Sequence, residues 1–233
     1  MPGLSKSRLA AFQQCPKRLW LEVHRRDLLT YGDAAQRRFD VGHAVGELAR
    51  AQYPDGILIE HDDDLAQAIA ATTAALAERR PIFEATFDHG HVLVRVDLLL
   101  PDGADGWHMA EVKSTASAKL HHLPDLTTQV HVARQCGLNI TRATIRHIDT
   151  SFTLDTLGDY RGFLRDSDLL DSVEAKLPEF PLIVLNALAT LDGTEPNVAP
   201  GDHCADPYDC PFQDHCGYVE PRSRQHERLA ARG

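Results

Sequence analysis

The chain has 233 residues, of which 43% are hydrophobic and 25% charged, as in a soluble globular domain with a substantial core. Its formal net charge of −10 argues against a protein that binds nucleic acid through overall basic charge. The longest apolar stretch, PLIVLNALATL, is too short to cross a bilayer, and no charged-then-apolar signal opens the chain. We therefore expect a cytoplasmic protein without a membrane partner.

The first fifty residues are predicted to form helices with a basic surface. Ser5 is a suitable N-cap for a helix that presents Leu9 to the core, and Pro16 breaks or restarts this helix directly after Cys15. Residues 1–50 contain nine basic and five acidic residues, so their charge is +4 in a chain whose total is −10. This segment is suited to contact a nucleic-acid strand, although solvated helix faces would have the same composition.

The following segments alternate between helical and strand patterns. Residues 64–80 consist mainly of strong helix formers, and the apolar patterns of residues 91–100 and 107–114 are typical of strands. Further helices are expected at 33–53, 123–137 and 159–191, the last with a break at LPEFP, and further strands at 82–87 and 141–152. This order of elements predicts an α/β domain.

Two of these strands carry charged residues that indicate catalysis. Asp97 interrupts the apolar run VLVRVDLLL, and Glu111 and Lys113 lie in WHMAEVKS after a turn rich in Pro, Gly and Asp. Residues two apart on a strand share a face, and a hairpin brings Asp97 close to Glu111. Carboxylates bind a hard divalent cation that lowers the pKa of bound water, and a lysine offsets phosphate charge. The pattern predicts metal-assisted phosphodiester hydrolysis; a solvated surface hairpin is the alternative.

Three of the five cysteines lie in one short segment near the end of the chain. Cys204, Cys210 and Cys216 are separated by five residues each, among prolines and aspartates that indicate irregular backbone. Cys15 is the best candidate for a fourth ligand. Four thiolates hold an iron–sulfur cluster or zinc.

Two histidines and the fifth cysteine complete this set of residues. His203 and His215 flank the cysteines and keep zinc open, although the spacing differs from the short C-x2-C pairs of zinc ribbons. Disulfides or free thiols are the alternative, but the uneven number of cysteines and the lack of secretory features favour a reducing compartment. Cys136 is expected to be an ordinary buried thiol at a helix end.

The joint arrangement of these motifs resembles the PD-(D/E)XK nuclease superfamily. Within it, the chain is similar to RecB-like exonucleases with a [4Fe-4S] cluster, including the CRISPR-adaptation exonucleases and the nuclease domain of AddB. In that group one cysteine near the N-terminus and three near the C-terminus bracket the nuclease core, and the opening LSKSRLAAFQQCPKRLWL is also similar. The cysteines in the matching order here are Cys15, Cys204, Cys210 and Cys216.

The resemblance implies a fold and a division of the chain. The expected fold is a restriction-endonuclease-like core, a mixed central sheet flanked by helices, with the N- and C-terminal segments joined at the iron–sulfur cluster. Residues 1–233 would form one RecB-like nuclease domain. Within it, residues 1–30 and 192–220 would form the lobe that binds the cluster, and residues 82–150 the catalytic core.

The resemblance also implies roles for individual residues. Asp97, Glu111 and the carbonyl of Val112 would hold Mg²⁺ or Mn²⁺, Lys113 would orient water and stabilise the phosphate, and Gln129 would position the lysine or the substrate backbone. The implied activity is exonuclease cleavage of single-stranded DNA or DNA ends. DNA-repair or CRISPR-adaptation proteins would be its partners.

The chain departs from the family pattern at two positions. Gly46 stands where the family has a metal-binding histidine, while His43 and Glu47 lie nearby on the same expected helix and could replace that ligand or be solvated. Ala133 stands where a tyrosine follows the glutamine. Two alternative functions follow: a catalytically impaired nucleic-acid-binding or scaffold protein of the same fold, or a zinc-binding adaptor.

Overall fold

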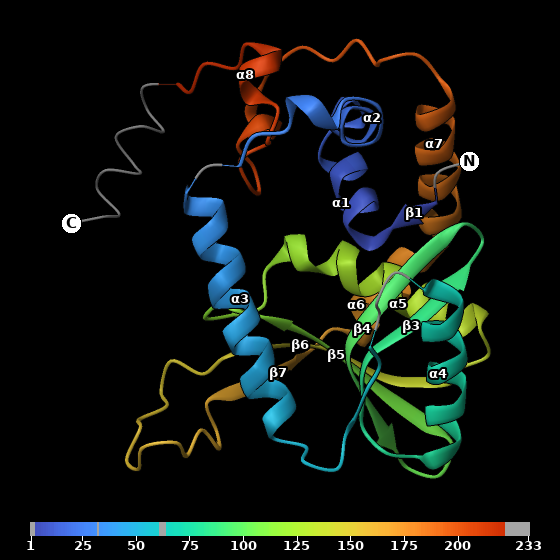
Figure 1. Ribbon diagram of the computed structural model, residues 1–233, viewed down its shortest axis with the longest axis vertical. Helices are drawn as coiled ribbons and strands as arrows, with labels where there is room; N and C mark the ends of the chain where they lie inside the picture. The colour runs from blue at the N-terminus through green and yellow to red at the C-terminus, as the bar shows by residue number, and fades with distance from the viewer. Residues whose placement is uncertain (1–2, 32, 61–63, 222–233) are drawn as a thin grey trace.

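A mixed sheet of seven strands forms the centre of the protein (Figure 1), as seen in a computed structural model that describes residues 3–31, 33–60 and 64–221, with the backbone alone for 33–35. Residues 222–233 of the predicted domain lie outside the described residues. The strands follow the order β2-β3-β4-β5-β6-β7, and β1 pairs with β4. Their bounds are β1 Leu4–Ser5, β2 Ile57–Leu58, β3 Ile82–His89, β4 Val92–Asp102, β5 Gly106–Lys113, β6 Ile140–Ile148 and β7 Leu164–Asp168.

The middle of the sheet is an antiparallel meander of β3, β4 and β5. A tight turn joins β4 to β5, with Asp102 opposite Gly106 and Gly103 at a φ of +62°, a conformation that glycine adopts without strain. After β5 the chain crosses over through a helix to β6, which pairs parallel to β5, and β7 returns antiparallel at the edge. The predicted hairpin at 91–100 and 107–114 is confirmed.

Helices cover the sheet, and most of their predicted positions are confirmed. Side chains near the C-terminal end of α3 pack on one face of the sheet. On the other face, α5 lies between the strands and α1 (Figure 1). The coarse prediction of an α/β domain with a mixed sheet flanked by helices is therefore confirmed. The helices are α1 Lys6–Gln14, α2 Pro16–His24, α3 Asp33–Ala51, α4 Leu65–Glu78, α5 Leu123–Gln135, α6 Leu170–Lys176, α7 Phe180–Asp192 and α8 Gln213–Cys216.

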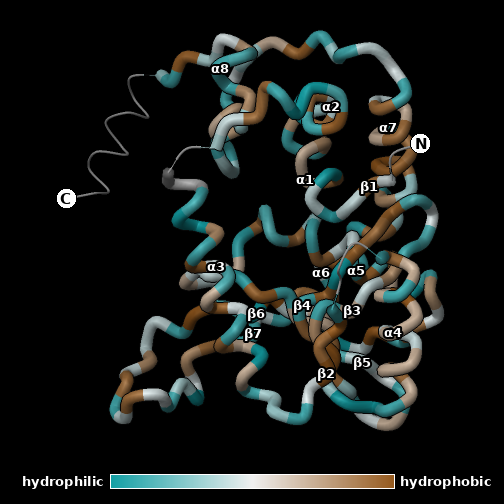
Figure 2. Tube along the Cα trace, in the orientation of Figure 1, coloured by the Kyte–Doolittle hydropathy of each residue, from teal (hydrophilic) through white to brown (hydrophobic). Residues whose placement is uncertain are grey.

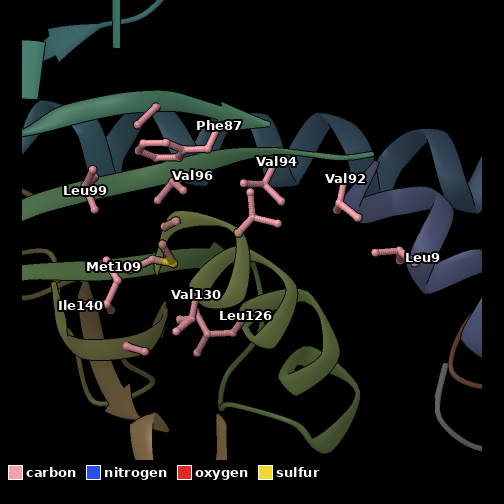
Figure 3. Close-up of a cluster of buried hydrophobic side chains, with 14 of the residues drawn as sticks. Leu9, Phe87, Val92, Val94, Val96, Leu99, Met109, Leu126, Val130 and Ile140 are labelled. Carbon is pink, nitrogen blue, oxygen red and sulfur yellow. The ribbon is translucent and has the colours of Figure 1, made fainter. Parts of the chain in front are cut away.

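The main core fills the space between the sheet and α5. Val94 and Val96 of β4, Met109 of β5, and Leu126 and Val130 of α5 are at most 1% exposed and meet in this layer (Figure 3). Hydrophobic residues run along the central strands in the hydropathy view (Figure 2). Burial of this apolar surface is the main favourable contribution to folding and fixes how α5 lies on β5.

The alternation of side chains in β3 and β4 is interrupted beside the candidate site. Ile82 and Ala85, three residues apart, share the main core, as do Val96 and Leu99, whereas a regular strand puts residues two apart on one face. Glu84 lies within the interruption and has a φ of +56°, which is unusual for a residue other than glycine. Such an irregularity re-aims side chains, and here it falls next to Asp97.

The two ends of the described chain lie together. The side-chain amide of Gln14 donates to the carbonyls of His203 (2.6 Å) and Tyr208 (2.8 Å), and Trp20 donates to Gly193 at 3.0 Å. The backbone amide of Thr30 donates to a carbonyl of the C-terminal segment at 3.1 Å. Residues 1–30 and 192–220, the predicted cluster-binding lobe, thus contact one another directly, at the top of Figure 1.

Two predictions about individual segments of the fold are wrong. Residues 164–168, predicted as part of a helix, form strand β7, because they complete the edge of the sheet through pairing with β6. Cys136 is exposed rather than buried, because it caps the solvent-facing end of α5. None of the helices in the described ranges combines the length and the apolar character that crossing a membrane requires.

Candidate functional site

The hairpin places the predicted catalytic residues side by side. Glu111 and Lys113 of β5 share a face, and the ammonium group of Lys113 donates to Glu111 Oε1 at 2.8 Å. Asp97 lies on the adjoining strand, where its Oδ2 accepts a hydrogen bond from the backbone amide of Val112 at 2.8 Å. The expected proximity of these residues is confirmed.

Glu111 is the most heavily bonded side chain of the site. It is 2% exposed, and besides Lys113 it accepts hydrogen bonds from Lys6 at 2.8 Å to each oxygen and from Gln129 at 2.7 Å to Oε2. Gln129 is fully buried on α5, so the predicted placement of this glutamine toward the hairpin is confirmed. Three elements, α1, β5 and α5, therefore meet at one carboxylate.

The two carboxylates of the site have opposite pKa shifts. Burial and the neighbouring charge of Glu111 raise the pKa of Asp97 to about 7. Burial alone would also raise the pKa of Glu111, but the ammonium groups of Lys113 and Lys6 hold it well below its ordinary value. The pKa of Lys113 is raised despite burial, because Glu111 and Asp125 both stabilise its charged form. The site thus holds one firm anion and one carboxyl that titrates near neutral pH.

A cleft of about 820 Å³ opens beside these residues. It is bounded by α3, the hairpin and the segments at both ends of the chain, and Asp97, Val112 and Lys113 lie in its wall. The aromatic rings of Tyr31, Phe39 and Tyr208 also line it. Its charged lining is mostly basic, although the whole chain is acidic: Arg8, Arg18, Arg26, Arg38, Arg50 and Lys113 against Glu22, Glu84, Asp97 and Asp209.

The two candidate replacements for the family histidine lie on α3. His43 lines the cleft and Glu47 does not, and their side chains are 76% and 62% exposed and 3.5 Å apart. In the described part of the chain, neither forms a hydrogen bond or an ion pair with Asp97 or Glu111. Gly46 also lines the cleft, where a side chain would find space up to the Arg50 guanidinium. No contact among the described residues therefore supports the prediction that His43 or Glu47 supplies a metal ligand.

The cysteines converge from both ends of the chain. Cys15 stands between α1 and α2, Cys204 lies in a short 3-10 turn, and Cys216 ends α8. The backbone amide of Cys210 donates to the Cys204 carbonyl at 2.8 Å. All four side chains line one small cavity of about 10 Å³. The fourth cysteine expected from the N-terminal end is therefore found beside the other three.

The thiols are held in a mostly apolar environment. Burial raises the pKa of Cys210 to about 11, and it also raises the pKa of Cys216, with partial offsets from Arg18 and Lys17 respectively. His203 lines the same cavity, whereas His215 lies 3.9 Å from Glu195. No group of three or more His, Cys, Asp and Glu among the described residues is arranged as it stands to hold a metal ion.

Two further residues of the site could not be predicted from the sequence, whereas a third could have been. Lys6 reaches Glu111 from 105 positions away, and His122, 1% exposed and in the cleft wall, leaves its Nε2 without a partner in the described ranges. Asp125 accepts a hydrogen bond from Lys113 at 2.8 Å. Because Asp125 and Gln129 are four apart on a predicted helix, their shared face was a signal for this contact.

Comparison with known protein families finds no family that matches this chain. Comparison with curated proteins finds no matching sequence.

Proposed function

We propose that this chain has a restriction-endonuclease-like core and is a metal-dependent exonuclease. Its substrate would be single-stranded DNA or DNA ends. One observation carries the proposal: Asp97 and Lys113 lie in the wall of a cleft whose charged lining is mostly basic, and Lys113 is hydrogen-bonded to Glu111, which also accepts from Gln129. Buried charges in a sheet are costly unless they are paired or used. A phosphodiester backbone is the anion that such a cleft suits in a chain of net negative charge.

The residues of the site fit a hard divalent cation. Asp97 has only the Val112 amide as a hydrogen-bond donor among the described residues, and its raised pKa reflects a buried charge that a cation would stabilise. Gln129 Oε1 is buried without a partner in those same residues, next to Glu111. We expect Asp97, Glu111 and the Val112 carbonyl to hold Mg²⁺ or Mn²⁺, which would lower the pKa of a bound water and act as a Lewis acid.

The remaining chemistry belongs to side chains of this chain. Lys113, held by Glu111 and Asp125, would offset the negative charge that develops on the phosphate and orient the attacking water. Gln129 fixes one oxygen of Glu111. The arginines of the cleft would neutralise neighbouring phosphates and hold the strand in place.

A thiolate-bound metal centre is the second part of the proposal. Cys15, Cys204, Cys210 and Cys216 line one cavity, and a metal would overcome the burial that raises the pKa values of Cys210 and Cys216. We propose a [4Fe-4S] cluster that ties the two chain ends together. The cavity of about 10 Å³ has room for a single ion, so a four-iron cluster would require the segments around it to move apart; zinc, which would need less room, is the second candidate. A zinc-binding adaptor function would follow from that outcome.

The nuclease proposal is tested with end-labelled single-stranded DNA in Mn²⁺. We expect cleavage by the wild type and its loss in Glu111→Ala, while the control Glu174→Ala, on the exposed face of α6, retains it. Activity that persists in Glu111→Ala would reject the site. A folded wild type that binds DNA without cleaving it would favour the non-catalytic binding function.

The metal-centre proposal is tested by metal analysis after anaerobic purification. We expect iron and acid-labile sulfide in the wild type and in Cys136→Ser, whose thiol lies outside the set, and their loss in Cys210→Ser. Stoichiometric zinc in a colourless protein would establish the alternative. Equal metal content in Cys210→Ser and Cys136→Ser would reject the four-cysteine site.

A further inference from the structure

Lys6 is a partly buried cation of the candidate site to which the proposed chemistry gives no role. It is the first residue of α1, directly after the N-cap Ser5, and its ammonium group lies 2.8 Å from each oxygen of Glu111. Its charge also acts on Asp97, so it faces both proposed metal ligands. An ammonium group therefore stands where a carboxylate-bound cation would be expected.

The hydrogen bonds of Glu111 leave no lone pair free. A carboxylate offers about four lone-pair sites. Here Oε1 accepts from Lys6 and Lys113, and Oε2 accepts from Lys6 and Gln129. A metal ion can therefore coordinate Glu111 only if one of these donors leaves.

Among the three donors, Lys6 is the one that can leave at least cost. Lys113 is also bound to Asp125 at 2.8 Å, and Gln129 is fully buried on α5 with a second hydrogen bond to the Asp125 carbonyl at 3.2 Å. Lys6 has Glu111 as its single ion-pair partner among the described residues, and its side chain is 22% exposed. Its long flexible stem can carry the charge toward water.

We propose that Lys6 is a displaceable internal cation, which occupies Glu111 until a divalent metal ion replaces it. This inference rests on the proposed nuclease site and adds a residue that sets its metal affinity. In the absence of metal, Lys6 neutralises Glu111 and stabilises the site. Binding of a divalent cation must break the two Lys6–Glu111 hydrogen bonds, so the apparent affinity is lowered by competition.

The test is Mn²⁺ binding, followed by electron paramagnetic resonance of free Mn²⁺ without DNA. We expect Lys6→Met and Lys6→Gln to bind Mn²⁺ at least about tenfold tighter than the wild type, which corresponds to about 1.4 kcal/mol. Lys176→Met is the matched control, because Lys176 is 54% exposed, pairs with Glu179 and does not line the cleft. The Mn²⁺ affinity of this control should change by less than about twofold, since an exposed charge outside the cleft is screened.

A second measurement does not depend on the folding of the variants. In the wild type, the side-chain ¹⁵N signal of Lys6 should shift toward that of a solvated lysine as Mg²⁺ saturates the site. Equal or weaker Mn²⁺ binding by both Lys6 variants, a change in Lys176→Met as large as in Lys6→Met, or an unchanged Lys6 signal at saturation would each overturn the inference. If one of these results were obtained while Glu111→Gln still lost metal binding, the proposed nuclease site would stand and only the inference about Lys6 would be rejected. If no variant bound metal, both proposals would be rejected.

Discussion

Replacing Glu111 with glutamine removes the carboxylate on which two ammonium groups converge. The amide keeps the size of the side chain but turns a donor toward Lys6, Lys113 or Gln129, all of which are donors themselves. Lys113 retains Asp125, whereas Lys6 has no second ion-pair partner in the described part of the chain. Breaking a buried ion pair leaves an uncompensated charge, so we expect the free energy of unfolding to fall by about 3 kcal/mol.

The assay is urea unfolding at neutral pH in EDTA, followed by circular dichroism, with equal m-values as the condition for comparison. The control is Glu174→Gln, which removes an ion pair with Arg134 of 2.7 Å whose carboxylate is 47% exposed. An exposed pair contributes about 0–1 kcal/mol, so the control should be nearly as stable as the wild type. If Glu111→Gln lost no more than the control, the ammonium groups would be solvated and the reasoning about a buried site would be refuted.

Two further predictions concern His122, beside the hairpin, and the ion pair between β6 and β7. Burial and Lys113 lower the pKa of His122 from 6.5 to about 4, so the unfolded chain binds a proton between these values that the folded protein does not. The free energy of unfolding therefore falls by about 2–3 kcal/mol as the pH falls from 6.5 to 4. In urea unfolding, His122→Phe should lose less stability over this pH window than the wild type. Equal dependence of stability on pH in the two proteins would contradict this. Asp166→Asn should cost about 3 kcal/mol in thermal unfolding, because Arg146, 7% exposed, is bound to both oxygens of Asp166. The control is Asp168→Asn, because the exposed Asp168 pairs with Arg142, and this change should cost almost nothing. Equal losses of stability in Asp166→Asn and Asp168→Asn would reject the argument.

Local patterns predicted the hairpin well because its signals are local. Apolar alternation and turn residues define β4 and β5, and residues two apart on a strand share a face whatever the rest of the fold does. Asp97, Glu111 and Lys113 were therefore placed together from the sequence. Gln129, on helix α5, was placed toward them through the resemblance to the family's glutamine motif.

Strand β7 shows where local patterns fail. Its sequence, LRDSD, has neither apolar alternation nor β-branched residues. It becomes a strand because it completes the sheet edge, where Arg146 of β6 is paired with Asp166 of β7 at 2.7 Å. Tertiary pairing overrides strand propensity in such a segment, and a pattern local to residues 164–168 does not include the partner Arg146.

The irregularity at Glu84 was equally invisible. Its φ of +56° arises where β3 and β4 change the face of their side chains, and it depends on two strands together. The contact of Lys6 with Glu111 joins positions 105 apart and requires the final packing of α1 on the sheet. A single sequence predicted which residues meet at the hairpin, but not which additional charges surround them.

Helix α1 connects the two candidate sites. It has nine residues and a length of about 13 Å, begins at Lys6 beside Glu111, and ends one residue before Cys15 in the thiol cavity. Leu9, between these two ends, is fully buried, so the helix rests on the core as one rigid element and a shift at either end tilts it as a whole. If the proposed metal centre holds the Cys15 end, its loss should therefore loosen the hold of Lys6 on Glu111. We expect Cys15→Ser to bind Mn²⁺ more tightly than the wild type, in the same direction as Lys6→Met, whereas an affinity equal to that of Cys136→Ser would show that the two sites are independent.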